Sequence, residues 1–331
     1  MATKVGIDLG TSNSIISVVG KDVLISEPTV VAISNKDKRV VAIGEDAKGM
    51  LGKVPEDIEA RRPIRQGVIA SYKLTEMMIS HLMNKALGKV RFFKPEIMIS
   101  VPAGITSVEE RAVIEAAAQA GAGRVYLIPE PIAAAIGAKM PISSSAGNMI
   151  VNTGGGTSEI AVISMNGIVN FESKRVAGDS LNEAIVNYIR RRTNLVIGEQ
   201  MAERIKIEIG SALPLEVPLT MQIRGRDGSS GMPTSIALNT NEVVDGIRPT
   251  LNQIIDSIKH VLEVTPPELS SDIIDRGMVL SGGTAQLRSI DELFTKATGV
   301  PAHVIEGPTR AVINGILEAL ENIELIKRAL R

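Results

Sequence analysis

Two glycine-rich segments of this chain have the residue types of a phosphate-binding loop. They are Gly6-Ile7-Asp8-Leu9-Gly10-Thr11-Ser12-Asn13 and Val151-Asn152-Thr153-Gly154-Gly155-Gly156-Thr157. Each begins as an apolar strand, turns at glycine and hydroxyl residues, and continues into a second β-rich run. In such a turn the backbone N–H groups can converge on an anion without interference from Cβ atoms. One loop is weak evidence because Gly-Thr turns are common, but two copies half a chain apart indicate a duplicated phosphate clamp and a candidate ATPase.

The polar groups of the two loops divide into phosphate donors and a candidate metal ligand. Asp8 stands at the end of the first strand, where it can hold Mg²⁺ through water, since Mg²⁺ keeps much of its hydration. An aspartate before a glycine is otherwise an ordinary turn residue, and the second loop is what favours the metal role. The phosphate donors are Thr11, Ser12 and Asn13 on one side and Gly154, Gly155 and Gly156 on the other.

Two further segments suit a nucleotide site. Glu130 lies between two prolines directly after an apolar strand, a rigid mount for a carboxylate that orients an attacking water. Taken alone, Pro-Glu-Pro is more often a solvated turn. The run Gly282-Gly283-Thr284-Ala285 follows a strand and opens a helix, where ribose and base contacts are favourable. A single Gly-Gly after a strand is itself weak evidence for ligand binding.

Strand-like runs alternate with helical periodicity along the chain, which predicts an α/β fold. The expected strands, besides those of the two loops, cover residues 23–25, 30–33, 39–43, 97–102, 125–128 and 277–281. The expected helices cover 74–87, 107–120, 132–138, 179–193, 199–212, 241–264, the dozen residues after 285, and 308–330. Ser107 is expected to begin a capping box, and residues 140–147 are typical of a linker.

Composition narrows the class of protein. The chain has 331 residues, enough for two domains with separate cores, and 44% of them are apolar although only 2% are aromatic. It has no cysteine, which excludes disulfides and thiolate metal sites and fits a reducing cytosol. A formal net charge of −1 argues against binding of nucleic acid. Without a signal peptide or a membrane-spanning run, we expect a soluble, cytoplasmic protein. His81, His260 and His303 are isolated and lack metal-ligand spacing.

Taken in order, these motifs resemble the actin / heat-shock-70 ATPase / sugar-kinase superfamily, and most closely its MreB family of bacterial actin homologues. The matching segments cover nearly the whole chain, and the run at Thr265–Leu269 is specific to MreB-like proteins. Besides the two loops, the resemblance is carried by Pro102–Thr106, Glu130–Gly137, Gly154–Val162, Val176–Asp179, Lys206–Gly210, Thr265–Leu269 and Gly282-Gly283.

The resemblance implies an actin-like fold of two related domains, or four subdomains, around a cleft for ATP and Mg²⁺. The first domain is expected at residues 1–140, with a small subdomain inserted at about 27–65. The second is expected at 141–331, with its insertion at about 180–250. It further implies a slow ATPase coupled to head-to-tail polymerisation into paired protofilaments. Such filaments lie on the inner face of the cytoplasmic membrane with membrane-embedded cell-shape proteins, and organise cell-wall synthesis and rod shape.

The resemblance also assigns roles to individual residues. Glu130 and Thr157 are expected to position the hydrolytic water, and Glu203 and Lys206 to flank the nucleoside. Asn152 stands where the family usually has aspartate, so a negative charge near the cation is missing. We therefore expect weaker Mg²⁺ coordination and slower hydrolysis than in relatives, with nucleotide binding retained.

Two other departures concern a turn and the membrane. Thr284 stands where the family usually has the third glycine of a Gly-Gly-Gly run, and we expect this to change the details of the turn but not its role. The amphipathic N-terminal helix of many relatives is absent, because Ala2-Thr3-Lys4 is too short. Phe92 and Phe93, two of only four phenylalanines, stand where relatives carry a membrane-insertion loop. Their basic neighbours suit an anionic membrane surface, and the alternative is that both rings pack beneath the following strand.

Three alternatives remain open. A small-molecule kinase of the same fold needs a carboxylate facing an acceptor substrate, and the sequence offers no convincing candidate. A chaperone-type ATPase needs a peptide-binding domain beyond the end of this chain. An actin-like filament that positions an organelle or plasmid is the strongest rival, because such filaments share the ATP site and differ at their surfaces.

Overall fold

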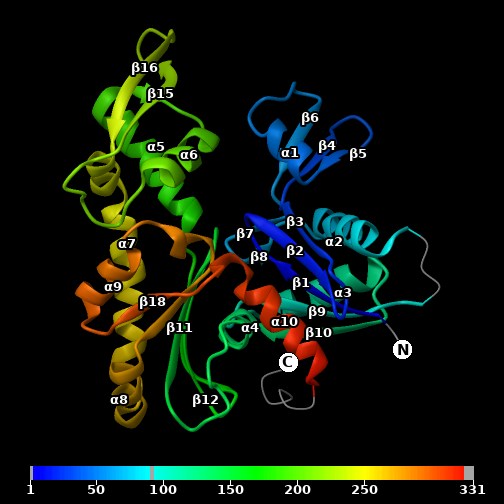
Figure 1. Cartoon of the computed structure of the whole chain (residues 1–331). Coiled ribbons are helices and arrows are strands. Elements are labelled where there is room, and N and C mark those ends of the chain that lie inside the picture. Colours follow the sequence, from blue (N-terminus) through cyan, green and yellow to red (C-terminus); the bar gives the residue numbers. More distant parts are fainter. Residues whose placement is uncertain (1–2, 90–92, 324–331) are drawn as a thin grey trace.

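Two five-stranded sheets of the same topology form the body of the molecule (Figure 1). The computed structural model describes residues 3–89 and 93–323. In each sheet three consecutive antiparallel strands are extended by two parallel strands on one side. The first sheet has the order β10 (Arg124–Pro129), β9 (Glu96–Val101), β1 (Lys4–Leu9), β2 (Asn13–Val18), β3 (Leu24–Pro28). The second has the order β13 (Gly167–Lys174), β12 (Ser158–Ser164), β11 (Asn148–Thr153), β17 (Met278–Ser281), β18 (Ala302–Val304).

Helices cover both faces of both sheets, so the central strands are apolar on each side. Helices α2 (Tyr72–Leu87) and α3 (Ser107–Gln119) pack on one face of the first sheet, against alternate residues such as Val5 and Ile7. The other face contacts α4 (Glu130–Gly137) and α10 (Ala311–Glu321), which also pack on Ile150 of the second sheet. Beyond the second sheet lie α5 (Gly178–Thr193), α7 (Thr240–Glu263) and α9 (Ile290–Thr298). The two sheets therefore share the layer formed by α4 and α10.

Helices α4 and α10 touch backbone to backbone. A Cβ atom on Gly137 would lie 1.9 Å from the carbonyl oxygen of Ala311, and one on Gly315 would lie 1.8 Å from that of Ala133. Glycine at both positions allows this approach. The C-terminal helix is also tied to β1, because Lys4 Nζ donates to the Leu320 carbonyl over 2.7 Å. Thus α10, from the end of the chain, contacts strands from its beginning.

Each sheet carries a small additional unit on the same side of the molecule, at the top of Figure 1. In the first half it contains β4 (Val31–Ser34), β5 (Val40–Ile43), α1 (Glu45–Met50) and β6 (Ile58–Arg61), followed by the hairpin of β7 (Ile64–Arg65) and β8 (Val68–Ile69). In the second half it contains β14 (Leu195–Val196), α6 (Glu199–Ile209), β15 (Thr220–Asp227) and β16 (Pro233–Asn239). The chain also forms α8 (Pro267–Arg276) and the 3₁₀ turns η1 (Gly283–Gln286) and η2 (Pro308–Arg310).

The α/β class and most expected elements are confirmed, but several boundaries differ. The capping box at α3 is formed by Thr106 rather than Ser107, with Glu109 as its reciprocal partner. The dozen residues after 285 hold a shorter helix, α9, and α6 stops at Ile209. The helix expected at 308–330 begins only at Ala311, because Pro308–Arg310 is a 3₁₀ turn, and residues 324–331 lie outside the described part of the chain.

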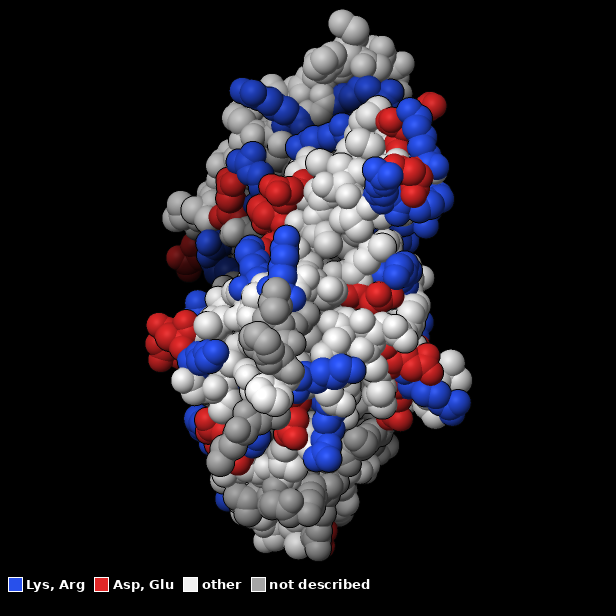
Figure 2. Space-filling view, turned by 90° about the vertical axis from the view of Figure 1, so that its right-hand side faces the viewer, with Lys and Arg blue, Asp and Glu red and all other residues white. Residues whose placement is uncertain are grey.

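The molecular surface is mixed in charge on the side shown in Figure 2. Lysine and arginine side chains lie among aspartates and glutamates rather than in one continuous basic patch (Figure 2). Within residues 3–89 and 93–323, none of the helices combines the length and the apolar character needed to cross a bilayer.

Candidate functional site

The two glycine loops meet where the two halves join, although Gly10 and Gly154 are 144 positions apart in the sequence. A Cβ atom on Gly155 would lie 1.9 Å from Ser12 Oγ, and one on Gly156 would lie 2.4 Å from Thr11 Oγ1. Any side chain at these positions would push the loops apart, which explains the glycines. The structure therefore brings together the two loops that the sequence paired.

Neighbouring segments hold the second loop in place. The Gly154 carbonyl accepts hydrogen bonds from Thr284 Oγ1 at 2.7 Å and from the Gly178 N–H at 3.2 Å. The Gly155 carbonyl accepts the Asp179 N–H at 2.8 Å. Thr284 thus reaches the phosphate loop, although the sequence expected it to contact the nucleoside. The run that contains it turns at Gly282, whose φ is +87° and whose Cβ position would lie 2.3 Å from the Thr153 carbonyl.

Two carboxyl groups and an amide meet beside these loops. Asp8 accepts a hydrogen bond from Ser100 Oγ at 2.8 Å. Asn152 donates from Nδ2 to Glu130 Oε2 over 3.4 Å and accepts from Ser281 Oγ at 3.0 Å. Glu130 is the first residue of α4, with Pro129 as its N-cap, so the rigid mount expected from the two prolines is a helix start.

Burial perturbs the acidity of these groups. Burial raises the pKa of Asp8 to about 6, and the Ser100 hydrogen bond lowers it in part. The pKa of Glu130 lies well above its ordinary value because the carboxyl is buried and because Glu159 and Asp8 add negative charge nearby. Such groups gather at functional sites, where a proton or a cation relieves the repulsion.

The donor set fits a magnesium nucleotide. Asp8 and Asn152 offer hard oxygen atoms, and Mg²⁺ binds through one or two carboxylates, waters and phosphates. No group of three or more His, Cys, Asp or Glu side chains that could hold a metal occurs in the part of the chain that the structure describes. The hydroxyl of Thr153, next to Gly154, is buried without a hydrogen-bond partner. Water-mediated binding of Mg²⁺, as expected for Asp8, requires no fuller set of protein ligands.

Thr157 and Gly67 pack together at the edge of the site. Thr157 is buried, and a Cβ atom on Gly67 would lie 2.8 Å from its Cγ2. Gly67 has φ of +77° and its N–H donates to Thr11 Oγ1 at 3.1 Å. The β7–β8 hairpin therefore contacts both loops, a connection that the sequence did not indicate.

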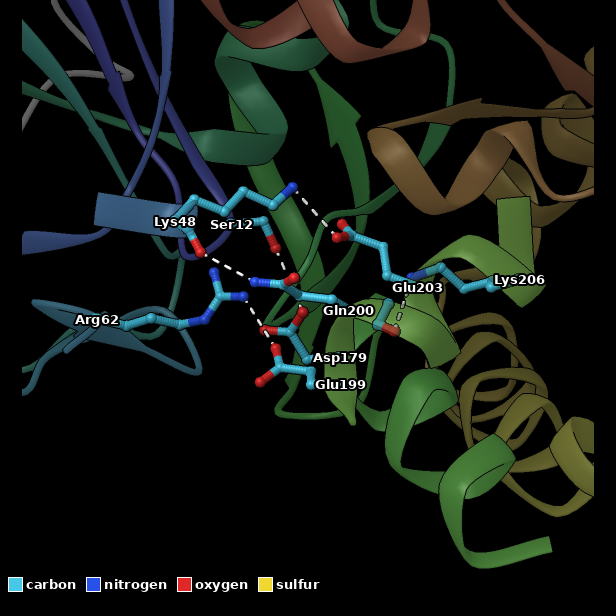
Figure 3. Close-up of polar contacts among 9 residues, drawn as sticks. Ser12, Lys48, Arg62, Asp179, Glu199, Gln200, Glu203 and Lys206 are labelled. Carbon is cyan, nitrogen blue, oxygen red and sulfur yellow. Dashed lines mark hydrogen bonds and ion pairs between the residues drawn. The ribbon is translucent and has the colours of Figure 1, made fainter. Parts of the chain in front are cut away.

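Helix α6 faces the small unit of the first half through polar contacts (Figure 3). Lys48 pairs with Glu203 at 3.1 Å, and its carbonyl accepts from Gln200 Nε2 at 3.0 Å. Arg62 of the small unit pairs with Glu199 of α6 at 2.9 Å. Beside these contacts, Ser12 Oγ of the first glycine loop donates a hydrogen bond to Asp179 Oδ1 of α5 at 3.3 Å.

Lys206, the other α6 residue expected at the nucleoside, lies on the phosphate-loop side of these contacts. It donates to the Gly178 carbonyl at 2.9 Å, and burial lowers its pKa. The sequence missed Lys48, Arg62 and Glu199 as contact residues, since charged residues on a small sheet and a helix face have the pattern of an ordinary solvated surface.

The remaining residues that the sequence analysis selected make fewer contacts than those above or lie outside the described part of the chain. Asn13 is exposed at the start of β2, and Ala285 is buried within η1, where Gly283 has open space at its Cβ position. Phe93 is 83% exposed, and Phe92 lies outside the described residues.

This chain is similar to known proteins both in sequence and in architecture. The MreB/Mbl protein family model matches residues 2–328. MreB of Escherichia coli strain K12, a cell shape-determining protein, is 46% identical over 325 residues, covering 96% of this chain and 93% of that protein. Mbl of Bacillus subtilis strain 168, also a cell shape-determining protein, is 46% identical over 327 residues, covering 99% and 98%.

Solved structures agree with this result. MreB5 of Spiroplasma citri bound to AMPPNP superposes with a TM-score of 0.94 at 32% identity, covering 98% of this chain and 97% of that one. A MamK double helical filament has a TM-score of 0.81 at 19% identity, covering 96% and 98%, which shows a shared fold. The actin-like fold expected from the motifs is confirmed. With the family model matching almost the entire length, this chain belongs to the MreB/Mbl family of actin-like proteins.

Proposed function

We propose that this protein is an MreB-type cytoskeletal ATPase that binds ATP, hydrolyses it slowly, and polymerises into filaments. The observation that carries the proposal is the contact between the loops of residues 10–13 and 154–156, made possible by Gly155 and Gly156. MreB5 of Spiroplasma citri, which has nearly the same architecture, binds AMPPNP. Its ADP-bound form also superposes, with a TM-score of 0.93.

In this proposal the chain holds the nucleotide from two sides. The backbone and hydroxyl donors of the first loop and the N–H groups of the second bind the phosphates, and Asp8 holds Mg²⁺ through water with Asn152 beside it. Bound Mg²⁺ neutralises phosphate charge. The donors are Thr11, Ser12, Asn13, Gly154, Gly155 and Gly156, and the nucleoside lies among Glu203, Lys206, Gly282, Gly283, Thr284 and Ala285.

Glu130 and Thr157 are proposed to orient the water that attacks the terminal phosphate. Glu130 is held by Asn152 at the start of α4, and its raised pKa makes it a stronger base than an ordinary glutamate. Thr157 is buried and its methyl group packs against Gly67, which fixes the position of its hydroxyl.

The two halves are proposed as domains of residues 1–140 and 141–331, with small subdomains at about 27–65 and 180–250. The two sheets of equal topology support this division. The packing of α10 on α4 and β1 makes this helix a shared element of the two.

We further propose that the filaments consist of paired protofilaments on the inner face of the cytoplasmic membrane, where they work with membrane-embedded cell-shape proteins in cell-wall synthesis. The 83% exposure of Phe93 next to Lys94 supports a membrane contact through Phe92 and Phe93. Replacing both with alanine should abolish pelleting with anionic liposomes, and continued pelleting would contradict this contact.

Negative-stain electron microscopy of the protein with Mg-ATP, with and without anionic liposomes, tests the whole proposal. Filaments lying on vesicles are the expected result. Filaments only in free solution would favour the alternative, a filament that positions an organelle or plasmid. An absence of filaments under every nucleotide condition would contradict the cytoskeletal function.

A further inference from the structure

A buried acidic residue near the site, Glu159, has so far entered only through its charge beside Glu130. Glu159 is the second residue of β12 and its side chain is completely buried. It pairs across the sheet with Asn152 of β11. Its neighbours in the strand, Ile160 to Ile163, are all buried apolar residues. An acidic group in such a strand is costly unless its oxygens are hydrogen-bonded.

Both oxygens of Glu159 have partners, and these come from different halves of the molecule. Oε2 accepts the N–H of Ala103 at 3.1 Å, from the loop that follows β9 in the first sheet. Oε1 accepts a hydrogen bond from the hydroxyl of Ser173, on β13 in the second sheet. The next residue of the loop, Gly104, lies against Phe171 of β13, with 3.4 Å from its Cβ position to Cε2. Glu159 therefore fastens the first-half loop to the second sheet.

The same loop contacts the residues proposed to act on water. The Cβ position of Gly67 lies 3.1 Å from Pro102 Cγ and 2.8 Å from Thr157 Cγ2, so Pro102, Gly67 and Thr157 pack around one point. Thr157 precedes Glu159 by two residues, near the start of the same strand. A shift of the loop at Ala103 would thus be transmitted through Pro102 and Gly67 to Thr157.

We propose that Glu159 is a positioning residue for ATP hydrolysis: it holds residues 102–104 against β12 so that Thr157 keeps its place opposite Glu130. It acts through this loop rather than on the nucleotide, since its two oxygens are occupied by Ala103 and Ser173. The inference rests on the proposed ATPase function and goes beyond it. Because the phosphate loops are held by other contacts, Glu159 should affect turnover without affecting nucleotide affinity.

The test compares kcat with the dissociation constant of a fluorescent ATP analogue. In Glu159→Ala the hydrogen bond from the buried Ala103 N–H to the carboxylate is lost, so the loop is held less firmly against β12. We expect kcat to fall roughly tenfold, since small misplacements of positioned groups cost at least that much, while the dissociation constant stays within about twofold of that of the wild type. Glu159→Gln can still accept from Ala103 through its amide oxygen and should retain most of the kcat.

Glu172→Ala is the matched control. Glu172 is a carboxylate on β13 that accepts a hydrogen bond from Ser257 Oγ at 2.6 Å, a contact that stays within the second half. It should leave kcat unchanged. If Glu159→Ala does not fold, Ser173→Ala takes its place, because it removes one of the two hydrogen bonds to the carboxylate. This variant should then lower kcat with unchanged affinity.

Three results would overturn the positioning role in an active wild-type protein. They are an unchanged kcat in Glu159→Ala or in the substitute Ser173→Ala, an equal loss of kcat in Glu159→Gln, and a loss of nucleotide affinity that accounts for the loss of turnover. A wild-type protein that binds ATP but does not hydrolyse it would instead contradict the proposed ATPase, and with it this role.

Discussion

Asn152 places a neutral amide beside the carboxylate of Glu130, where the family resemblance implies an aspartate. Both of its polar atoms are engaged, since Nδ2 donates to Glu130 and Oδ1 accepts from Ser281. The amide can therefore orient Glu130 without adding to the negative charge around it. What it cannot supply is a full charge for a cation.

Replacing Asn152 with aspartate tests whether the missing negative charge slows hydrolysis. We expect Asn152→Asp to raise the rate of ATP hydrolysis about tenfold, equivalent to about 1.4 kcal/mol of transition-state stabilisation, because the added charge strengthens the attraction for Mg²⁺. The rate is measured as phosphate release at saturating Mg-ATP. Ser281→Ala, which removes only the hydroxyl partner of Asn152, serves as the control. Equal turnover in Asn152→Asp and the wild type would contradict the explanation.

Asp8 should make the stability of the Mg²⁺-free protein depend on pH. Burial raises its pKa from 3.8 to about 6, so the folded state holds the proton more tightly than the unfolded state. This contribution is fully present below the unfolded pKa and is lost as pH rises through the folded pKa of about 6. Urea unfolding from pH 3.5 upward, at about half-unit steps, should show a decline with pH in the wild type that is smaller in Asp8→Asn. Identical slopes would contradict the assignment.

At this scale the sequence revealed residues that stand at glycine turns and strand ends. Asp8, Thr11 and Glu130 were selected as candidates because such positions are where polar groups gather. Glu159 was missed, although it belongs to a quoted motif, because one acidic residue near the start of a strand has the pattern of an outward-facing one. Its side chain is buried and bonded to the loop at Ala103, a contact between the two halves that the strand's own sequence does not indicate.

Among the elements, α4 and α10 pack between the two sheets and join them. They form one layer, and each contributes a glycine to the crossing, Gly137 and Gly315. At such close approach, an added methyl group meets backbone, which cannot move aside as a flexible side chain can.

The crossing makes a specific prediction about stability. Gly137→Ala should lower the free energy of unfolding by about 3 kcal/mol, because the new Cβ would lie 1.9 Å from the Ala311 carbonyl oxygen. Gly49→Ala is the control: Gly49 lies in helix α1 with nothing near its Cβ position, and alanine there should stabilise by up to about 1 kcal/mol. Urea unfolding measures both. A Gly137→Ala variant as stable as the wild type would show that the helices can separate without cost.

Elements with strong apolar runs were predictable, and those at the surface were not. The strands at Val31 and Ile97 are buried and were expected. The hairpin of β15 and β16 was missed because exposed polar residues occupy much of both strands. Helix α8 was also missed, since it buries only Ile273.

For the whole molecule, the contacts between α6 and the small unit of the first half connect residues that lie far apart in the chain. Each ion pair is partly exposed and contributes roughly 0–1 kcal/mol alone. Together Lys48–Glu203 and Arg62–Glu199 bridge the two halves next to the proposed nucleotide site (Figure 3). Their combined effect should appear in nucleotide exchange rather than in folding.

Removing both cations should speed the release of nucleotide. We expect the double variant Lys48→Ala/Arg62→Ala to release a fluorescent ADP analogue about fivefold faster, corresponding to roughly 1 kcal/mol. Stopped-flow displacement by excess ADP gives the rate. Lys36→Ala is the control, because Lys36 pairs with Asp57 within the small unit itself. A double variant with the wild-type rate would show that these contacts do not restrain the site.

The central claim is that a nucleotide binds where the two glycine loops touch, and titration of fluorescent ATP into Gly155→Ala tests it most directly. The added Cβ would lie 1.9 Å from Ser12 Oγ and force the loops apart. At about 1–3 kcal/mol for such overpacking, affinity should fall roughly five- to 150-fold. Gly198→Ala, with nothing near its Cβ position, should bind as the wild type does. Wild-type affinity in a folded Gly155→Ala variant would contradict the claim and place the nucleotide elsewhere.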